Sequence, residues 1–440
     1  MKFDQPANVN YAATIVRVPA PVDLPGLDNL VGIPILGHQA LTQRGIEAGE
    51  LRVLFTAETQ LSDDYAHQNN LFRHADLNKD EGETGYLEDN RRIKALKLRG
   101  HRSNALLMPL ESLAYTGLDI DKLRAELADV SHPVVLFDKI GDHEICKKYE
   151  LPRKAGQPAR SKVERAFKRV DKKVFPEHLE TDSYFRSRHV LRAGREVVIT
   201  QKLHGTSWRG GRVPVLRQLK WYEKLLKRLG VNIPEWEYDV VFGSRKVIKD
   251  PNNPNQEHFY KFDLWTEYGK RVANLIPEGF IVYGELIGWT PDGAPLQRGY
   301  TYHLARNEAE LYVYRVAHIN RQGHLSDLSW DGVKQFCQER GLKWTPELFR
   351  FIHDFDPEYD TTGDTTDDIV DSFMDRSYAE LYGEVNPDVL PLSDPKTVDE
   401  GVVIRQEGLV PVLLKAKSQV FLEHETKLLD RGELDMESVA

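Results

Sequence analysis

The chain has 440 residues, of which 40% are hydrophobic and 29% are charged. These fractions exclude a disordered or collagen-like chain, and the length predicts two or three domains rather than a single core. Two cysteines exclude a disulfide framework, and the lack of an apolar run of about 18 residues excludes an obvious membrane span.

The cellular compartment is predicted from the same composition. The N-terminus MKFDQPANVN has no apolar signal-peptide core. Cys146 and Cys337 are too few for a thiolate metal site and indicate a reducing environment. We therefore expect a cytoplasmic protein with no membrane partner.

The net charge of −9 is unevenly distributed. Residues 147–173 hold eleven Lys/Arg against three acids, a net of +8, whereas residues 354–400 hold fifteen Asp/Glu against two bases, a net of −13. Local patches matter more for nucleic-acid binding than the total charge. The overall acidity therefore does not exclude a nucleic-acid partner.

Residues 1–146 have the pattern of short strands separated by turns. Ala12–Val18 and Leu51–Thr56 are rich in β-formers, and Ile93–Leu98 alternates apolar with cationic residues before the apolar run Ala105–Met108. The alternation predicts a strand with one face in a core and a basic face outward. A small OB-type β-barrel that presents this face to RNA fits the pattern.

The candidate RNA contacts of this barrel are the cationic residues of that face, namely Lys97, Arg99 and Arg102. The alternative is an edge strand whose lysines only block aggregation. Nothing in the strand itself decides between the two interpretations.

The segment Asp76-x-Asn78-x-Asp80 resembles the start of a calcium-binding loop. Glu81 replaces the glycine expected at the sixth position, and Leu87 replaces the glutamate at the twelfth. These departures favour a polar surface loop.

Residues 147–175 are basic, contain Pro and Gly, and are predicted to link two domains. A basic run is usually a solvated surface. Its position beside a candidate catalytic domain also makes phosphate contact plausible, with Lys172 and Lys173 as candidates.

Residues 176–440 are predicted to form a second domain, so that the whole chain is α+β. Six strands are expected: Glu196–Thr200, Tyr238–Phe242, Phe280–Tyr283, Leu311–His318, Gly401–Gln406 and Val410–Lys415. Leu216–Leu229 has the spacing of an amphipathic helix with a basic outer face. Residues 331–395 are predicted to be an acidic, mainly helical insertion.

Chemistry is indicated first by Val197–Ser207, where a run of β-formers places Lys202 at a strand end before Gly205. A four-residue motif is weak alone, but other charged groups follow apolar strands in order. These segments are Gly243-Ser244-Arg245, Ile281–Gly288 with Glu285, Leu311–Val316 with Tyr314, Glu400–Arg405 and Leu413–Lys417. A charge at the end of an apolar strand needs a partner.

This ordered set resembles the covalent nucleotidyltransferase superfamily, which comprises ATP-dependent RNA and DNA ligases and mRNA capping enzymes. His204, in the Lys-x-His-Gly-Thr form of the motif, resembles the phage-type nick-sealing RNA ligases. Asn78–Arg92 and Lys97–Gly100 resemble a smaller branch in which an OB domain precedes the transferase domain. The resemblance implies an ATP-grasp-like adenylation domain of antiparallel sheets with flanking helices.

The resemblance also implies roles for single residues. Lys202 would be the nucleophile that attacks the α-phosphate of ATP, and a lysine attacks only when its amine is neutral. Lys415 and Lys417 would contact that phosphate, and Glu400 would hold Mg²⁺ or Mn²⁺. The nucleotide would further contact Gln201, His204, Gly205, Arg245, Glu285 (a ribose hydroxyl) and Tyr314 (stacking on adenine, with Tyr312 as the neighbouring alternative).

Three features depart from that family pattern. Gln201 stands where glutamate is common, and Ser207 where the phage enzymes have asparagine. About twenty residues follow Lys417, so no C-terminal OB domain is expected. Substrate contact would then rest on the N-terminal barrel.

The sequence therefore predicts an ATP-dependent RNA ligase that joins RNA 3′-hydroxyl and 5′-phosphate ends through a lysyl-AMP intermediate. The alternatives within the superfamily are a DNA ligase and a GTP-using capping enzyme. A non-enzymatic alternative is an RNA-binding protein with an inactive transferase domain.

Overall fold

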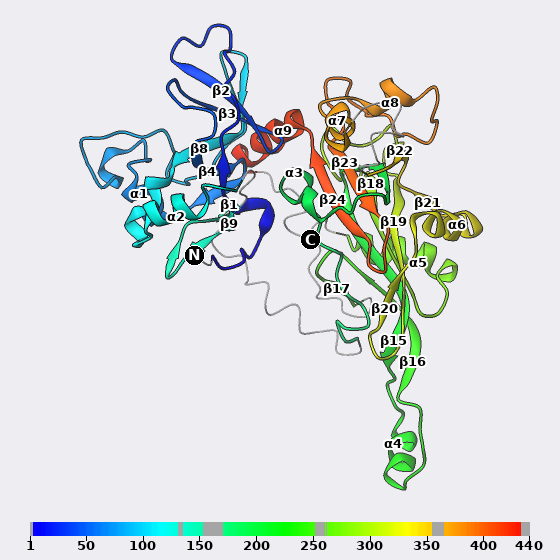
Figure 1. Cartoon of the computed structure of the whole chain (residues 1–440). Coiled ribbons are helices and arrows are strands. Elements are labelled where there is room, and N and C mark those ends of the chain that lie inside the picture. The colour runs from blue at the N-terminus through cyan, green and yellow to red at the C-terminus, as the bar shows by residue number, and fades with distance from the viewer. Residues whose placement is uncertain are drawn as a thin grey trace. The chain divides into compact units, whose positions relative to one another are not determined.

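The computed structural model describes residues 3–130, 135–152, 170–250, 260, 262–353 and 365–432. The chain divides into two compact units, and each is described by itself (Figure 1). The first comprises Met1–Pro152, Asp182–His189 and Ala416–Leu434, and the second Arg153–Thr181, Val190–Lys415 and Asp435–Ala440. None of the described helices is long and apolar enough to cross a membrane.

The first unit is built on a six-stranded sheet with the order β2-β3-β8-β4-β1-β9. Its strands are β1 (Ala13–Arg17), β2 (Leu30–Ile35), β3 (His38–Gln43), β4 (Leu51–Thr56), β8 (Ala105–Pro109) and β9 (Val135–Phe137). Alternate residues of β4 enter separate apolar clusters, with Val53 and Phe55 in one and Leu54 in the other. Successive side chains of a strand point to opposite faces, so this sheet is covered on both faces.

The remaining elements of the first unit are short. Its helices are α1 (Asp63–Gln68), α2 (Ile120–Glu126), α3 (Tyr184–Ser187) and α9 (Gln419–Asp430). Its small strands are β5 (Thr59–Leu61), β6 (Leu96–Leu98), β7 (His101–Ser103), β10 (Lys139–Ile140), β11 (His143–Glu144), β12 (Cys146–Lys148) and β13 (Asp182–Ser183). The main sheet ends at β2 and β9, and no pairing joins these two strands among the described residues. The OB-type barrel therefore stays a prediction.

The strand predicted over Ile93–Leu98 differs from the structure. Ile93 and Ala95 are buried, but only Leu96–Leu98 forms a strand, and Leu96 and Leu98 are 47% and 42% exposed. The physical reason is that β6 pairs only with β7, in a two-stranded sheet apart from the main one. The prediction of a continuous apolar face in the core was wrong for the two leucines.

The C-terminal helix α9 belongs to the first unit, although the sequence-based division counted it with the second domain. Thr426 Oγ1 donates a hydrogen bond of 2.7 Å to Glu58 Oε1 and accepts one of 3.1 Å from the Ala95 amide. Asp430 forms an ion pair with Arg92. These contacts link α9 to residues more than 300 positions earlier, which local sequence patterns cannot predict.

Glu58 provides a test of this contact. Burial raises the pKa of Glu58 to about 7, against the opposing effects of Arg92 and Thr426. The folded state therefore binds more protons than the unfolded state between pH 4.5 and 7, and the contribution of Glu58 to stability falls as the pH rises through that window. Between pH 4.5 and pH 8, the free energy of unfolding of the wild type should fall by roughly 3 kcal/mol relative to that of Glu58→Gln, as measured by urea denaturation. Glu81→Gln, at an exposed acid of the same unit, gives the baseline, and a pH-independent difference would contradict the assignment.

The second unit contains two sheets. One has the order β17-β16-β15-β18-β19-β20, with β21 pairing to β19, and the other contains β24, β23, β14 and β22 in that order. The strands of the first sheet are β15 (Thr206–Leu216), β16 (Trp236–Gly243), β17 (Ile248–Lys249), β18 (Phe280–Gly288), β19 (Ala309–Ile319), β20 (Leu325–Asp327) and β21 (Lys343–Trp344). Those of the second are β14 (Glu196–Gln201), β22 (Glu347–Ile352), β23 (Gly401–Gln406) and β24 (Val412–Lys417), whose last two residues belong to the first unit.

The second unit also contains five described helices. They are α4 (Trp221–Arg228), α5 (Leu264–Val272), α6 (Trp330–Arg340), α7 (Thr366–Ser372) and α8 (Tyr378–Tyr382), of which α5 and α6 contribute to the main core. That core joins Trp208 of β15, Trp265 of α5 and Trp330 of α6 with Val198 of β14. Residues of both sheets therefore pack in this core. All six strands predicted for this domain are present, and the pairings of β14 with β22 and β23 and within the larger sheet are antiparallel apart from β19 with β21.

The predicted insertion at 331–395 differs from the structure in its first half. Helix α6 is part of the core, and β22 pairs with β14 through the register Glu196↔Ile352 to Thr200↔Glu347. The alternation of Phe349 and Phe351 with polar residues is a strand pattern, and the high acid content of the following residues obscured it. Residues 354–364 of the predicted insertion lie outside the described residues.

The predicted linker at 147–175 is described only at its ends, because residues 153–169 lie outside the described residues. Neither end is an independent linker. Residues 146–148 form β12, and Val170, Val174 and Phe175 are buried in a cluster with strands of the larger sheet in the second unit.

Candidate active site

Lys202 follows directly on the central strand β14. The strand pairs on both sides, with β22 and β23, and Val197, Val198 and Ile199 are fully buried. The Lys202 amide donates to the Gly401 carbonyl (2.9 Å), and its Nζ lies 2.7 Å from Glu400 Oε1. The Lys202 side chain is 10% exposed and that of Glu400 is 0% exposed, so the ion pair at the end of this strand is almost completely buried from solvent.

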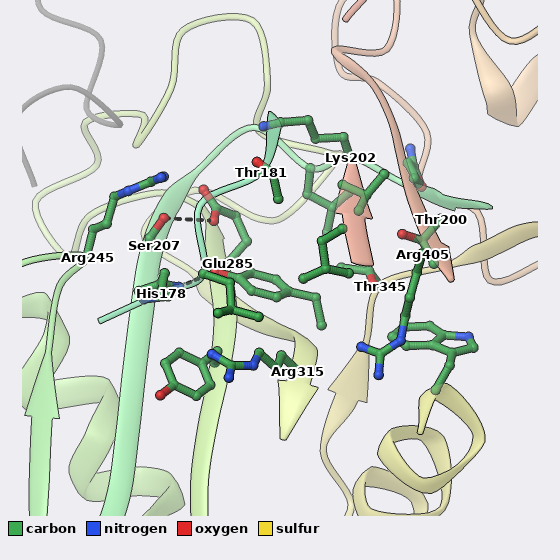
Figure 2. A pocket seen from close by; sticks show the side chains of 18 residues that line it. His178, Thr181, Thr200, Lys202, Ser207, Arg245, Glu285, Arg315, Thr345 and Arg405 are labelled. Carbon is green, nitrogen blue, oxygen red and sulfur yellow. Dashed lines mark hydrogen bonds between the residues drawn. The ribbon is translucent and has the colours of Figure 1, made fainter. Parts of the chain in front are cut away.

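A cavity with an empty volume of about 840 Å³ opens beside Lys202. Figure 2 shows side chains from several strands around it. Of the predicted site residues, its lining includes Gln201, Lys202, Arg245, Glu285 and Tyr314.

Glu285 lies on β18 with 5% of its surface exposed. Its carboxylate accepts hydrogen bonds from the Gly205 amide (3.1 Å) and from Ser207 Oγ (3.4 Å), the latter drawn in Figure 2. The lysine segment thus positions this acid. Ser207, which departs from the family pattern, has a definite partner here.

His204 and Gly205 fix the turn after Lys202. The His204 amide donates to Tyr302 Oη (2.8 Å), and His204 Nδ1 lies 3.5 Å from Glu400 Oε2. A Cβ on Gly205 would lie 2.1 Å from the Leu286 carbonyl oxygen. Only glycine lets the two backbones approach this closely.

Residues 195–418 match the model of the family described as RNA ligase. The chain belongs to the RNA ligase family. No curated protein matches it.

Several solved structures resemble this RNA ligase family member. A mutant of the Naegleria gruberi RNA ligase with AMP and Mn has 13% identity and a TM-score of 0.54, covering 94% of this chain and 98% of the other. A second mutant, with ATP and Mn, has 14% identity and a TM-score of 0.53 over the same shares. The same ligase with PPi has 14% identity and a TM-score of 0.52, again over 94% and 98%. At such identities the likeness shows a shared fold.

Tyr314 enters the cavity of this RNA ligase family member through an irregularity in the sheet. The pairing of β18 with β19 shifts register between Tyr283 and Gly284, opposite Tyr314. As a result the consecutive residues Tyr314 and Arg315 both line the cavity, whereas Tyr312 is not in its described lining. A bulge of this kind re-aims side chains.

The sequence analysis missed His178, which also lines the cavity. Its Nδ1 forms a short hydrogen bond with Tyr314 Oη, and its ring packs edge-on against Tyr283 at 5.1 Å. His178 precedes the first strand of its domain in a segment with no motif. Its position could not be found from the sequence.

Two buried arginines in the cavity wall were also missed. Arg315 forms a bidentate pair with Asp327 at 2.5 and 3.1 Å, and Arg405 pairs with Glu407 at 2.8 Å. Both occur inside the apolar motif segments, so a charge within a buried strand was the available signal.

The amide of Gln201 is held by its surroundings. Nε2 donates to Asp399 Oδ1 (2.7 Å) and to the Leu390 carbonyl (3.0 Å), while Oε1 accepts from the Leu390 amide (3.0 Å). Burial raises the pKa of Asp399 to about 6, opposed by the hydrogen bonds from Tyr378 and Gln201. These contacts support a structural role for the amide, and its nucleotide contact stays a prediction.

The two predicted phosphate-binding lysines fall in different units. Lys415 is half-buried on β24 in the second unit. Lys417 belongs to the first unit, where its Nζ lies 2.8 Å from Glu425 Oε1 and 5.0 Å from the ring centroid of Phe421. Their contact with the α-phosphate stays a prediction.

The predicted RNA contacts of the first unit have partners within it. Lys97 and Arg102 both pair with Glu423 of α9, at 3.3 and 3.0 Å, and Arg99 donates to the Gly26 carbonyl (2.9 Å). In the second unit, Lys172 pairs with Glu177 at 3.1 Å, and Lys173 is exposed. Their role in RNA binding stays a prediction.

In the loop at Asp76-x-Asn78-x-Asp80, the Asn78 side chain is not available as a calcium ligand. This side chain is 2% exposed, exchanges hydrogen bonds with the Phe72 backbone and donates to the Glu83 carbonyl. It is a structural residue of a surface loop.

Proposed function

We propose that this chain is an ATP-dependent RNA ligase that joins RNA 3′-hydroxyl and 5′-phosphate ends through AMP bound to Lys202. The observation that carries the proposal is the position of Lys202, at the wall of a cavity that Arg245, Glu285 and Tyr314 also line, and 2.7 Å from the buried Glu400. Membership of the RNA ligase family favours RNA over the DNA ligase and capping alternatives. The Naegleria ligase structures with ATP or AMP and Mn favour ATP as the nucleotide.

Three steps are proposed. The neutral Lys202 amine attacks the α-phosphorus of ATP, which forms an N–P bond and expels pyrophosphate. A 5′-phosphate oxygen of RNA then attacks the same phosphorus, which frees Lys202 and leaves a 5′-5′ pyrophosphate on the RNA. The 3′-hydroxyl of the second end attacks that RNA phosphate and releases AMP.

The residues around the cavity have separate tasks in this scheme. Glu400 Oε1, at 2.7 Å from Nζ, is within reach of the proton that Lys202 must lose. Glu285, positioned by Gly205 and Ser207, would accept a hydrogen bond from a ribose hydroxyl. Tyr314 would stack on adenine, and Arg245 would contact the ribose and later the RNA 5′ end.

Glu400 is also the candidate ligand for a divalent cation. No cluster of three or more His, Cys, Asp or Glu side chains suited to a metal occurs in the described part of the chain. One carboxylate is compatible with Mg²⁺ or Mn²⁺, which are commonly held by one or two carboxylates together with substrate phosphates and water. When bound, such an ion would offset the charge that develops on the phosphate.

Two further parts of the proposal concern the rest of the chain. The first unit would contribute an OB-type RNA-binding domain through Lys97, Arg99 and Arg102. The location would be cytoplasmic, in keeping with two free, buried thiols at Cys146 and Cys337.

The proposal is tested by incubating the protein with ATP labelled on the α-phosphate and Mg²⁺ or Mn²⁺. Label should survive denaturation, whereas label on the γ-phosphate should not, because pyrophosphate leaves. Competition by GTP and NAD identifies the nucleotide, and nicks with RNA or DNA at the 3′-hydroxyl side identify the polymer. Protein that binds RNA but never retains label would instead be the inactive, RNA-binding alternative.

A further inference from the structure

Helix α4 is carried at the far end of a long arm of the second unit (Figure 1). Strands β15 and β16 pair from Arg209↔Gly243 to Leu216↔Trp236, and α4 lies in the connection between them. The arm starts at Thr206, four residues after Lys202. The same β-ribbon therefore contributes to the cavity at one end and carries α4 at the other.

The apolar side of α4 is open to solvent. Residues that a helix of this amphipathic pattern normally buries are exposed: Trp221 (78%), Tyr222 (43%), Leu225 (51%), Leu226 (38%) and Leu229 (72%). The sequence predicted a helix over Leu216–Leu229 with a basic outer face. The helix is shorter, and its apolar face is uncovered as well.

Two cations on α4 have no acid partner in the part of the chain that the structure describes. The acids near the tip are used elsewhere, since Glu223 pairs with Arg217 at 2.8 Å and Glu235 pairs with Lys227. Among the described residues, no ion pair joins Lys224 or Arg228 to a carboxylate, and both are exposed. They are four positions apart, so they lie side by side and repel each other. This arrangement suits a ligand with several negative charges.

An aromatic surface adjoins these cations. Trp221 lies three positions before Lys224 and seven before Arg228, on the same edge of the helix. Its ring meets Tyr222 edge-on at 6.0 Å, and Lys220 Nζ lies 5.8 Å from the Tyr222 ring centroid. Exposed aromatic rings beside cations are the usual means of binding single-stranded nucleic acid, in which bases stack and phosphates pair with Lys and Arg.

We propose that the tip of this arm is a second RNA-binding site, with a base stacked on Trp221 and phosphates on Lys224 and Arg228. The inference rests on the proposed function for its choice of RNA as the polyanion. A homodimer through α4 is disfavoured, because one short helix supplies only part of the roughly 800 Å² per partner of a standard interface. A lipid surface is the other anionic partner that such a helix can bind, and the vesicle measurement below distinguishes it from RNA.

The arm also sets the distance between the two sites. At about 3.3 Å per residue, β15 spans roughly 33 Å from Thr206 to Leu216. At about 3.4 Å per nucleotide of a duplex strand, this length corresponds to roughly ten nucleotides. RNA whose bases stay stacked at this spacing would therefore extend about ten nucleotides from the joined ends to reach α4, and a more extended single strand would need fewer.

The test compares RNA binding by the full chain with three variants, using fluorescence anisotropy over a series of salt concentrations. Lys224→Ala/Arg228→Ala and Trp221→Ala should each weaken binding of a 5′-phosphorylated RNA of about 20 nucleotides by roughly ten-fold. The double variant should also lower the slope of log affinity against log salt by roughly 1.4 to 1.8, the value for two phosphates. Lys270→Ala/Arg271→Ala, at two exposed cations of α5 in the same unit, is the matched control and should bind as the wild type does.

RNA length and the leucines provide the decisive comparisons. RNA of about five nucleotides should lose less affinity in the α4 variants than the longer RNA does, since it occupies one site at a time and gains nothing from bridging the two. Unchanged affinity of Trp221→Ala and Lys224→Ala/Arg228→Ala for the longer RNA would overturn the inference. A different result in Leu225→Ser/Leu229→Ser would also overturn it. If this variant keeps wild-type RNA affinity but loses self-association or binding to anionic vesicles, the apolar face of α4 serves a protein or lipid surface.

The adenylation assay separates this inference from the proposed function. The first step needs no RNA, so the α4 variants should retain label from ATP at the wild-type level. If the wild-type protein forms no adduct and the α4 variants bind RNA more weakly than it does, the ligase proposal is refuted and the second site is supported. Normal adduct formation with unchanged RNA affinity in the variants would refute only the second site.

Discussion

Lys202→Arg should lose covalent AMP formation by at least about 10³-fold while the protein remains folded. An arginine stays protonated and cannot attack phosphorus, but its guanidinium can keep the buried Glu400 paired. Lys202→Ala should lose the adduct equally and also be destabilised by roughly 3–5 kcal/mol, because Glu400 is then buried without its cation. Labelled ATP measures the first effect and urea denaturation the second.

RNA that already carries a 5′-linked AMP is the control for this prediction. Only the first two proposed steps use the Lys202 amine, so both variants should still join such RNA to a 3′-hydroxyl end. Retention of label by Lys202→Arg would show that another group carries the nucleotide. Loss of the final step in Lys202→Arg would show that the substitution damages more than the nucleophile.

Glu400→Gln should reduce adduct formation by at least about 10²-fold, measured per folded molecule. The carboxylate is fully buried, with Lys202 at 2.7 Å and His204 at 3.5 Å, and an amide of the same shape removes only its charge. The substitution removes the negative charge opposite the Lys202 ammonium, so the free energy of unfolding should also fall by roughly 3–5 kcal/mol.

Glu407→Gln is the matched control, because Glu407 pairs with the buried Arg405 and forms no contact with Lys202 among the described residues. It should lose stability but keep its adduct yield per folded molecule. A metal titration separates the two roles of Glu400. If Glu400 holds a cation, Glu400→Gln should need more Mn²⁺ for half-maximal labelling, and an unchanged requirement would leave it as a partner of Lys202 only.

The strand before Lys202 could be predicted because its signal is local. Val197, Val198 and Ile199 are consecutive apolar β-formers, and the structure pairs this strand on both sides and buries all three of them. The same holds for the strands that carry Glu285 and Tyr314. Their order along the chain, rather than any one of them, pointed to the RNA ligase family.

Local patterns failed where distant residues decide the outcome. The strand β22 was assigned to a helical insertion because acidic residues follow it, yet pairing with β14 makes it a strand. Helix α9 was counted with the second domain, but Thr426 and Asp430 hold it to Glu58 and Arg92. Leu96, Leu98 and the apolar face of α4 have the spacing of core residues but are exposed. The spacing of apolar residues predicts that they share one face of an element, but it does not predict whether another element packs on that face.

The sequence by itself determined the fold class of the second unit, the strand that delivers Lys202 and the set of charged residues at strand ends. Strand and helix periodicity is encoded within a few neighbouring residues, and a buried charge stands out in an apolar run. Only the tertiary structure brought Glu400 to Lys202, placed His178 against Tyr314 and used a register shift to turn both Tyr314 and Arg315 into the cavity. These contacts join residues up to about 200 positions apart, and their geometry depends on sheet pairing, which the sequence of a single strand does not specify.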